Sequence, residues 1–455
     1  MVGIRVSRCA IARVALPRES TFRKTEWMPA FRRFPSSPYS AWPRASFRSM
    51  HSNASPTRPT FGAPFLFLLA MITALDAMAI DMYLPAFPSV ARELGASAGQ
   101  IQQTLSIFLV GLALGQGLYG PLLDRFGRRW PLLIGLSIFV LGSLIAALAP
   151  TVEWLLAARF LQALGAAAGL VAPRAIVSDV CTVQESARVF SVLMQVMMIA
   201  PILAPVAGSW LLTHGGWRMV FWTLAVVGAL GTAWSLRAIP ETLARERRAP
   251  LHPGAIARAY AQQCRDAGFM AYTLAGGFIL GALFVYISVS PFVLIEHFGM
   301  TPAHFSYFFA ANAVGIVAAG QLSLWLTKRW GEQRALLAGI ALHALAGLAL
   351  LAAVLCDAAP LPVYLALVGL SIWVLGLVFG NLTALTMAQA GAQAGVASAL
   401  MGLLQYLMGA VVGALVTLAA PGLVPLPATI MVCGALAMLC CWGAATAVNR
   451  RARVA

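Results

Sequence analysis

Two acidic residues, Asp76 and Asp81, lie within an apolar stretch that runs from about residue 61 to residue 85. The stretch is otherwise long and apolar enough to cross a lipid bilayer as a helix. A carboxylate near the bilayer centre costs roughly 2.5–3.5 kcal/mol on insertion scales, and such residues commonly handle protons or ions. The chain has 15 acidic residues, and these two are the ones expected at membrane depth. They are therefore the first candidates for proton or cation coupling.

Arg159 is the third candidate for proton coupling, because it lies at a similar expected depth. It is about six residues inside its apolar run, and Asp81 is about four residues from the end of its own, at ~1.5 Å per residue. An ion pair or a shared proton pathway with Asp81 follows from this depth, and an arginine that extends to the membrane interface is the alternative. Asp76 and Asp81 project about 140° apart on a helix, so they face different surroundings. Asp76 is a second site, a substrate contact or a hydrogen-bonded structural acid.

The composition indicates an all-α polytopic membrane protein. The chain is 60% hydrophobic and 10% charged over 455 residues, whereas soluble domains are usually about 25% charged. The apolar runs are also longer than the roughly 9–11 alternating residues of a barrel strand. A soluble globular domain and a β-barrel are both excluded as interpretations.

Twelve apolar runs predict twelve transmembrane helices in two groups of six. The expected spans are 61–85, 101–123, 131–149, 154–176, 189–212, 217–237, 269–293, 304–327, 335–355, 361–387, 395–419 and 424–447. The predicted domains are an N-terminal extension (1–60), a first six-helix half (61–237), a linker (238–268), a second half (269–447) and a tail (448–455).

The net charge of +16 reflects how the chain is oriented in the membrane. It gives no support to nucleic-acid binding. Arginine and lysine gather in the loops on one side of the predicted helices, in the linker and in the tail, while the loops on the other side contain only Arg92 and Arg218. The positive-inside rule then places both termini and the linker in the cytoplasm. The same positive charge is expected to give weak attraction to anionic lipid headgroups.

Residues 1–60 are rich in Arg, Ser and Pro, with Glu19 and Glu26 as their acidic residues. Three interpretations stay open: translation that naturally starts at Met50, a disordered basic tail, and an organellar transit peptide.

No pattern in the sequence suggests a cofactor, a metal or an enzyme. The seven cysteines show no disulfide or zinc spacing. His343 is the histidine expected at membrane depth, with packing favoured over proton relay. We find no phosphate-binding loop or nucleophile elbow. Hydrolysis and ATP-driven transport are therefore not expected.

The loop that follows the span 101–123 resembles the signature loop of the major facilitator superfamily. That pattern combines glycines, an acid and arginines, and it falls here on Gly120, Asp124, Arg125, Gly127, Arg128 and Arg129. The resemblance implies a cytoplasmic gating loop that holds two six-helix halves together, with glycines that allow close helix approach. The alternative is a basic cluster that only stops translocation.

Three further motifs narrow the resemblance. Arg159 and Gln162 match the family's arginine and glutamine pair, with Ala163 where glycine is usual. The antiporter motif of its drug exporters is similar to the run that contains Pro201, Pro205 and Gly208. The segment from Asp81 to Pro88 closely resembles the bicyclomycin-resistance (Bcr/CflA) group of drug:proton antiporters, which favours Asp81 as the principal proton site.

The resemblance implies a monomeric, proton-coupled multidrug exporter that works by alternating access. Its partners would be protons, the lipid bilayer and small amphipathic toxic compounds. Candidates for the substrate pocket are Tyr83, Gln162, Met194, Met198, Tyr286, Asn312, Asn381 and Gln405, because methionine and aromatic side chains suit a permissive site. The alternatives are a proton-coupled transporter of a metabolite with the same fold and, more distantly, a membrane sensor that does not transport.

Overall fold

The computed structural model describes residues 62–248, 253–390, 394–419 and 422–454, which all belong to one compact unit, Thr60–Ala455. The predicted N-terminal extension and residues 249–252 of the predicted linker lie outside this description, as does the last residue of the tail. The described ranges are almost entirely helical and contain no β-strand. The predicted all-α fold is therefore confirmed.

The first set of helices precedes the linker and the second set follows it. The first set is α1 (Ala63–Thr73), α2 (Leu75–Asp81), the 3₁₀ turn η1 (Leu84–Ala86), α3 (Phe87–Leu94), α4 (Ala98–Phe126), α5 (Arg129–Ala147), α6 (Val152–Val180), α7 (Val183–Gly215) and α8 (Arg218–Ala238). The linker contains the turn η2 (Arg245–Arg247) and α9 (Pro253–Cys264). The second set is α10 (Ala267–Pro291), the π-helical turn η3 (Phe292–His297), α11 (Pro302–Trp330), α12 (Glu332–Leu355), α13 (Leu361–Trp373), α14 (Leu375–Ala388), α15 (Ala394–Val416) and α16 (Pro425–Val454).

Within the described residues, eleven helices are long and apolar enough to cross a membrane, and a bent pair supplies a twelfth. The bent pair joins Ala63–Thr73 to Leu75–Leu94 at 41°. It corresponds to the predicted span 61–85, which was expected as one continuous helix. Two helices also form the predicted span 361–387, because the chain is interrupted at Val374. The other predicted spans match single helices that are mostly a few residues longer.

Side-chain caps explain where several of these helices begin. Ser97 precedes α4 and forms a reciprocal capping box with Gln100, and Thr182 does the same with Glu185 before α7. Such caps satisfy backbone N–H groups that have no partner inside the helix.

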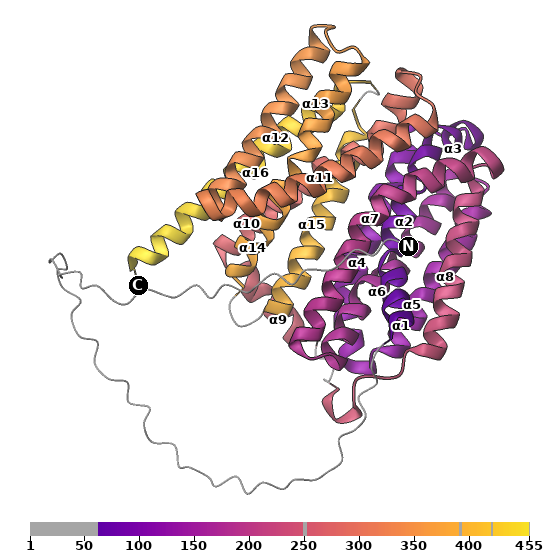
Figure 1. Cartoon of the computed structure of the whole chain (residues 1–455), viewed down its shortest axis with the longest axis vertical. Coiled ribbons are helices and arrows are strands. Elements are labelled where there is room, and N and C mark those ends of the chain that lie inside the picture. The colour runs from indigo at the N-terminus through magenta and orange to yellow at the C-terminus, as the bar shows by residue number, and fades with distance from the viewer. Residues whose placement is uncertain (1–61, 249–252, 391–393, 420–421, 455) are drawn as a thin grey trace, which may run out of the picture. The chain divides into compact units, whose positions relative to one another are not determined.

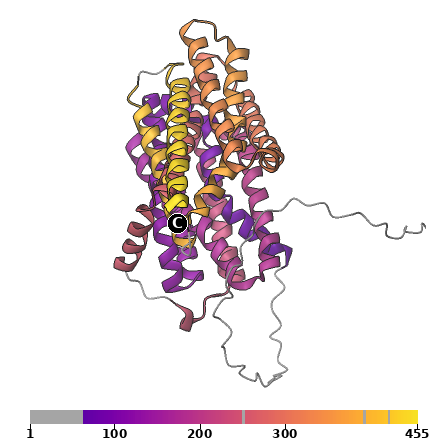
Figure 2. The same cartoon turned by 90° about the vertical axis from the view of Figure 1, so that its left-hand side faces the viewer.

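Small residues allow the helices to pack closely within each set. Helix α6 packs against both α4 and α5. On α4, Gly115 lies so close to Ala167 of α6 that a side chain would collide with it, as expected where membrane helices approach closely. In the second set, α16 packs on α10 and α12, which is visible on the near face in Figure 2.

The two sets meet along two helix pairs, α4 with α15 and α7 with α11 (Figure 1). The loop Asp124–Arg129 and the start of the linker lie at one end of the helices. We call this the arginine end. The opposite end carries the loops at 95–97, 148–151, 216–217, 298–301 and 356–360. The limits of the two halves and of the linker stay a prediction.

Candidate functional site

Asp76 and Asp81 both lie on α2, a helix of seven residues. The chain leaves regular α-helical geometry at Ala74 before this segment and at Met82 after it. Pro85 lies in the 3₁₀ turn that follows, where its missing N–H removes a helical hydrogen bond. Both acids therefore occupy a short piece of helix between two breaks, where one continuous helix was expected over 61–85.

Both carboxylates are buried, with 6% of Asp76 and 5% of Asp81 exposed. One oxygen of Asp76, Oδ1, is buried without a hydrogen-bond partner in the described part of the chain. The ion pairs of the described residues include neither acid. An unpaired charge in such a place is far more costly than a neutral carboxylic acid.

Arg159 of α6 is completely buried, with 0% of its surface exposed. Its Nη1 donates to the carbonyl oxygen of Ala79 at 2.9 Å and to Oε1 of Gln162 at 2.6 Å. Within the described ranges, no ion pair joins Arg159 to Asp81. The expected direct pair is thus not observed, and the alternative of an arginine at the membrane interface is wrong.

Aromatic rings surround the guanidinium of Arg159. Its central carbon lies 4.2 Å from the ring centre of Phe108, 5.1 Å from that of Tyr83 and 5.8 Å from that of Phe221. These rings come from α4, from the segment after α2 and from α8. Aromatic faces attract a cation, and the attraction is larger where water is excluded. The charge of Arg159 is therefore stabilised by rings and carbonyl oxygen.

A buried hydrogen-bond chain positions Arg159 beside the Asp81 segment. Gln162 accepts from Arg159, and its Nε2 donates to Oγ of Ser143 at 2.8 Å. Ser143 in turn donates to the carbonyl oxygen of Phe139 at 2.8 Å. Arg159 and Gln162, the two residues of the matched family motif, are therefore in direct contact. Arg159 thus links α5 and α6 to Ala79, two residues before Asp81.

Among the other pocket candidates, Tyr286 and Asn312 lie together in the second set. Asn312 Nδ2 donates to Tyr286 Oη at 2.8 Å, and Tyr286 stacks on Phe309 with ring centres 5.6 Å apart. Asn381 instead binds Ser323 and accepts from Thr327. The structure therefore divides these second-set candidates between two separate hydrogen-bond groups.

The remaining candidates do not join the Arg159 group. Gln405 of α15 lies against Gly276, where a side chain would collide with its amide. Met194 and Met198 are exposed on α7. His343 is buried and its Nδ1 lies 2.8 Å from the carbonyl oxygen of Ser371, which agrees with the packing role favoured from the sequence.

The antiporter-like run lies on α7, which continues as a helix through Pro201 and Pro205. Gly208 faces the carbonyl oxygen of Met82, so that any side chain at this position would collide with the backbone directly after Asp81. The glycine is therefore required for α7 to pack on the Asp81 segment.

At the arginine end, Arg128 is the centre of a paired charge network. Its Nε donates to Asp179 Oδ2 at 2.8 Å, and its Nη1 donates to Asp124 Oδ1 at 2.6 Å. Burial alone would lower the pKa of Arg128, but the hydrogen bonds and charges of Asp179 and Asp124 outweigh burial and raise it. Arg128 therefore remains charged.

Glu241 holds the start of the linker against the same loop. Its Oε1 accepts from the backbone N–H of Arg128 at 2.8 Å and from that of Leu243 at 3.1 Å. Gly127, with φ +91°, lies against the carboxylate, where a side chain would collide. Arg129 donates to the carbonyl oxygen of Leu236 at 2.6 Å.

The polar contacts given above join this loop to α6, α8 and the linker, because the acids Asp179 and Glu241 lie within reach. Its expected role in holding the two halves together stays a prediction. One expectation about the loop needs correction. Gly120 has open space beside it, so it does not allow a close helix approach. Gly111 and Gly115 have that role on α4. Arg125 is exposed.

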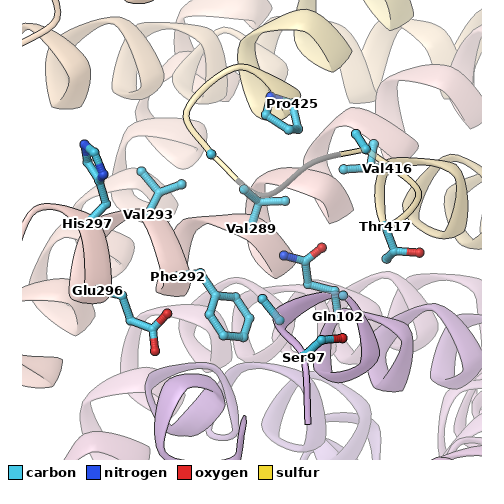
Figure 3. A pocket seen from close by; sticks show the side chains of 14 residues that line it. Ser97, Gln102, Val289, Phe292, Val293, Glu296, His297, Val416, Thr417 and Pro425 are labelled. Atoms are coloured by element: carbon cyan, nitrogen blue, oxygen red, sulfur yellow. The ribbon is translucent and has the colours of Figure 1, made fainter. Parts of the chain in front are cut away.

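A cavity of about 440 Å³ lies between the two sets at the opposite end (Figure 3). Its lining includes Gln102 of α4, Phe292 and Glu296 of η3, and Thr417 after α15. None of the eight predicted pocket residues lines it.

Residues 69–414 match the family model of the Major Facilitator Superfamily. The chain belongs to this superfamily. It is 37% identical to the uncharacterized MFS-type transporter YdgK of Bacillus subtilis, over 72% of this chain and 82% of that protein. It is 31% identical to a bicyclomycin resistance protein homolog of Haemophilus influenzae, over 64% and 74%. It is 33% identical to a chloramphenicol resistance protein of Pseudomonas aeruginosa, over 73% and 77%.

Solved structures of this superfamily show the same fold. A D-xylose–proton symporter matches with a TM-score of 0.67 at 14% identity, over 84% of this chain and 98% of that one. A bacterial homolog of the lysosomal transporter Spinster, in an inward-facing and occupied conformation, matches with a TM-score of 0.62 at 17% identity, over 84% and 96%. This superfamily member is therefore a multi-pass membrane protein.

Several residues around the major facilitator sites were not predicted from the sequence. Phe108, Phe221 and Ser143 meet Arg159 from distant parts of the chain, and no local pattern marks them. Asp179 and Glu241 had a usable signal, since each is an acid at the end of a predicted span on the arginine-rich side.

Proposed function

We propose that this major facilitator chain is a proton-coupled multidrug exporter that exchanges protons for small amphipathic toxic compounds. It performs transport without covalent chemistry, by alternating access, and acts as a monomer in the bacterial inner membrane. The arginine end, both termini and the linker lie in the cytoplasm, as the distribution of arginine suggests. The antiporter motif and the relatives named for bicyclomycin, chloramphenicol and multidrug resistance support export.

The observation that carries the proposal is the buried Asp81, which forms no ion pair within the part of the chain that the structure describes. A carboxylic acid in such a place is stable when neutral, and it ionises where water or a cation reaches it. Alternating access opens a central residue first to one side of the membrane and then to the other. Asp81 therefore binds a proton from one side of the membrane and releases it to the other. Arg159, bound to the carbonyl oxygen of Ala79 two residues before Asp81, positions the segment. Asp76, also buried, is proposed as a second site.

Proton release from inverted membrane vesicles with an acidic interior tests this function. Chloramphenicol, bicyclomycin and amphipathic dyes are added while a pH-sensitive dye reports the gradient. Export by exchange carries the compound into the vesicle and protons out, so the gradient falls. We expect Asp81→Asn, a neutral side chain of the same shape, to remove this response.

Asp357→Asn is the matched control, because Asp357 is exposed in the loop before α13 and its left-handed backbone, φ 52°, suits asparagine. It should respond like the natural chain. A response retained in Asp81→Asn but lost in Asp76→Asn would move the proton site to Asp76. No response to any compound, with inserted and folded protein, would contradict drug export.

A further inference from the structure

Ser306 of α11 is fully buried where the second set meets α7. Its Oγ lies 2.9 Å from the carbonyl oxygen of Pro205 on α7 and 2.8 Å from that of Pro302 on its own helix. The first contact joins the two sets, and the second lies within α11. A serine hydroxyl has one proton to donate, so these two carbonyl groups share a single donor.

The shared donor makes the contact between the sets easy to break. If α7 and α11 separate, the hydroxyl retains its bond to Pro302, and no buried donor loses its partner. Opening therefore avoids the penalty of an unsatisfied polar group. A side chain with one intrahelical acceptor and one acceptor across the interface stabilises contact without making it permanent.

The two other polar contacts described between the sets also lie at the opposite end. Arg92 and Glu296 form an exposed ion pair at 3.6 Å, which contributes little in water. Gln103 donates to Thr417 at 3.3 Å in a partly buried place. The bond of Ser306 is the fully buried one of these three, and it lies on the α7–α11 contact.

Helix α7 connects this bond with the proposed proton site. Pro205 accepts from Ser306, and Gly208, three residues later, packs on the carbonyl oxygen of Met82, next to Asp81. The turn η1, which begins three residues after Asp81, contacts α7, α10 and α11. A movement of the Asp81 segment therefore acts on the same helix that holds Ser306.

We propose that Ser306 is a positioning residue that holds α7 against α11 when the opposite end is closed. When that end opens, its hydroxyl donates to the carbonyl oxygen of Pro302 alone. This inference rests on the proposed alternating-access function and names the contact that regulates it. Ser306 does not touch Asp81 or substrate in this role. It sets how often the opposite end opens.

Distances between spin labels at the opposite end test this role. Cysteines at positions 151 and 358, exposed in two loops of that end, are labelled in a cysteine-free variant and measured by pulsed electron paramagnetic resonance in lipid nanodiscs. We expect Ser306→Ala to increase the long-distance population about 2- to 3-fold, less than the loss of a whole neutral hydrogen bond would give, because the hydroxyl keeps its bond to Pro302 in both arrangements. Ser306→Thr, which keeps the hydroxyl, should restore the population of the natural chain.

Ser288→Ala is the matched control, because Ser288 is a buried serine of the second set that donates within its own helix to Val285. It should leave the distances unchanged. Unchanged distances in Ser306→Ala, or equal shifts in Ser306→Ala and Ser288→Ala, would overturn the inference. The measurement uses neither substrate nor proton gradient, so its outcome is separate from that of the vesicle experiment.

Discussion

Two buried arginines of the first set are stabilised in opposite ways. Arg128, 8% exposed, forms ion pairs with Asp179 and Asp124 at the arginine end. Arg159, 0% exposed, is held by the carbonyl oxygen of Ala79, by Gln162 and by three aromatic rings. The described carboxylates that lie deep in the same set, Asp76 and Asp81, form none of its ion pairs.

This comparison suggests that the ion pairs of the arginine end fix one arrangement of the helices. The surroundings of Arg159 and the two acids Asp76 and Asp81 can instead change during transport. A paired charge is stable in one arrangement, and removal of one partner leaves the other buried alone. An acid without a cationic partner is sensitive instead to whatever reaches it, whether proton, water or a cationic group. The comparison predicts that substitutions at the arginine end act mainly on stability, and substitutions around Arg159 mainly on transport.

The largest expected effect is on transport, from Arg159→Gln. Glutamine removes the positive charge and the contacts with the three rings, and it no longer supports Ala79 beside Asp81. We expect the rate of substrate-driven proton release to fall about 100-fold, as when a reacting group is displaced by a change elsewhere in its support. The melting temperature should change little, because a buried charge without an acid partner is removed together with its desolvation cost.

Arg237→Gln is the control for this prediction. Arg237 is exposed on α8 and contacts the carbonyl oxygen of Ala233 on its own helix. Its transport and melting temperature should match those of the natural chain. A large fall in melting temperature for Arg159→Gln, with normal transport by the molecules that remain folded, would reverse the comparison.

Arg128→Gln should show the opposite pattern, with a loss of stability of about 2 kcal/mol. This is less than the 3–5 kcal/mol of a fully buried pair, because both side chains of the Arg128–Asp179 pair are 10% exposed. Among the described residues, Asp179 would then keep the hydroxyl of Thr242, at 3.1 Å, as its side-chain donor. Melting followed by tryptophan fluorescence measures the change. Arg125→Gln, at an exposed neighbouring position, should have no effect, and equal melting of the two variants would contradict the pairing argument.

The sequence predicts the paired region and the spans better than the surroundings of Arg159. The span 101–123 became α4, Ala98–Phe126, because its limits are marked by a cap and by arginines. The break at Ala74 was not predicted, since neither glycine nor proline lies at that position. The burial of Arg159 depends on Phe108 and Phe221, which only the packing of α4 and α8 brings together. Charges and caps act locally, whereas an aromatic surrounding is a property of the folded chain.

The smallest expected effect on stability is at Glu241. Two substitutions there distinguish the contribution of its charge from that of its hydrogen bonds. The Oε1 atom accepts from the backbone N–H groups of Arg128 and Leu243, and glutamine retains an oxygen at that position. Glu241→Gln loses mainly the ion pair with Arg248 at 3.6 Å, so it should cost less than about 0.5 kcal/mol. Glu241→Ala leaves two N–H groups without their acceptor and should cost about 1 kcal/mol.

Hydrogen exchange of peptides that cover 239–248 should quicken in the alanine variant and not in the glutamine variant. Equally quickened exchange in both variants would mean that the charge of Glu241, and not its hydrogen bonds to the backbone, holds the start of the linker, which would contradict this prediction.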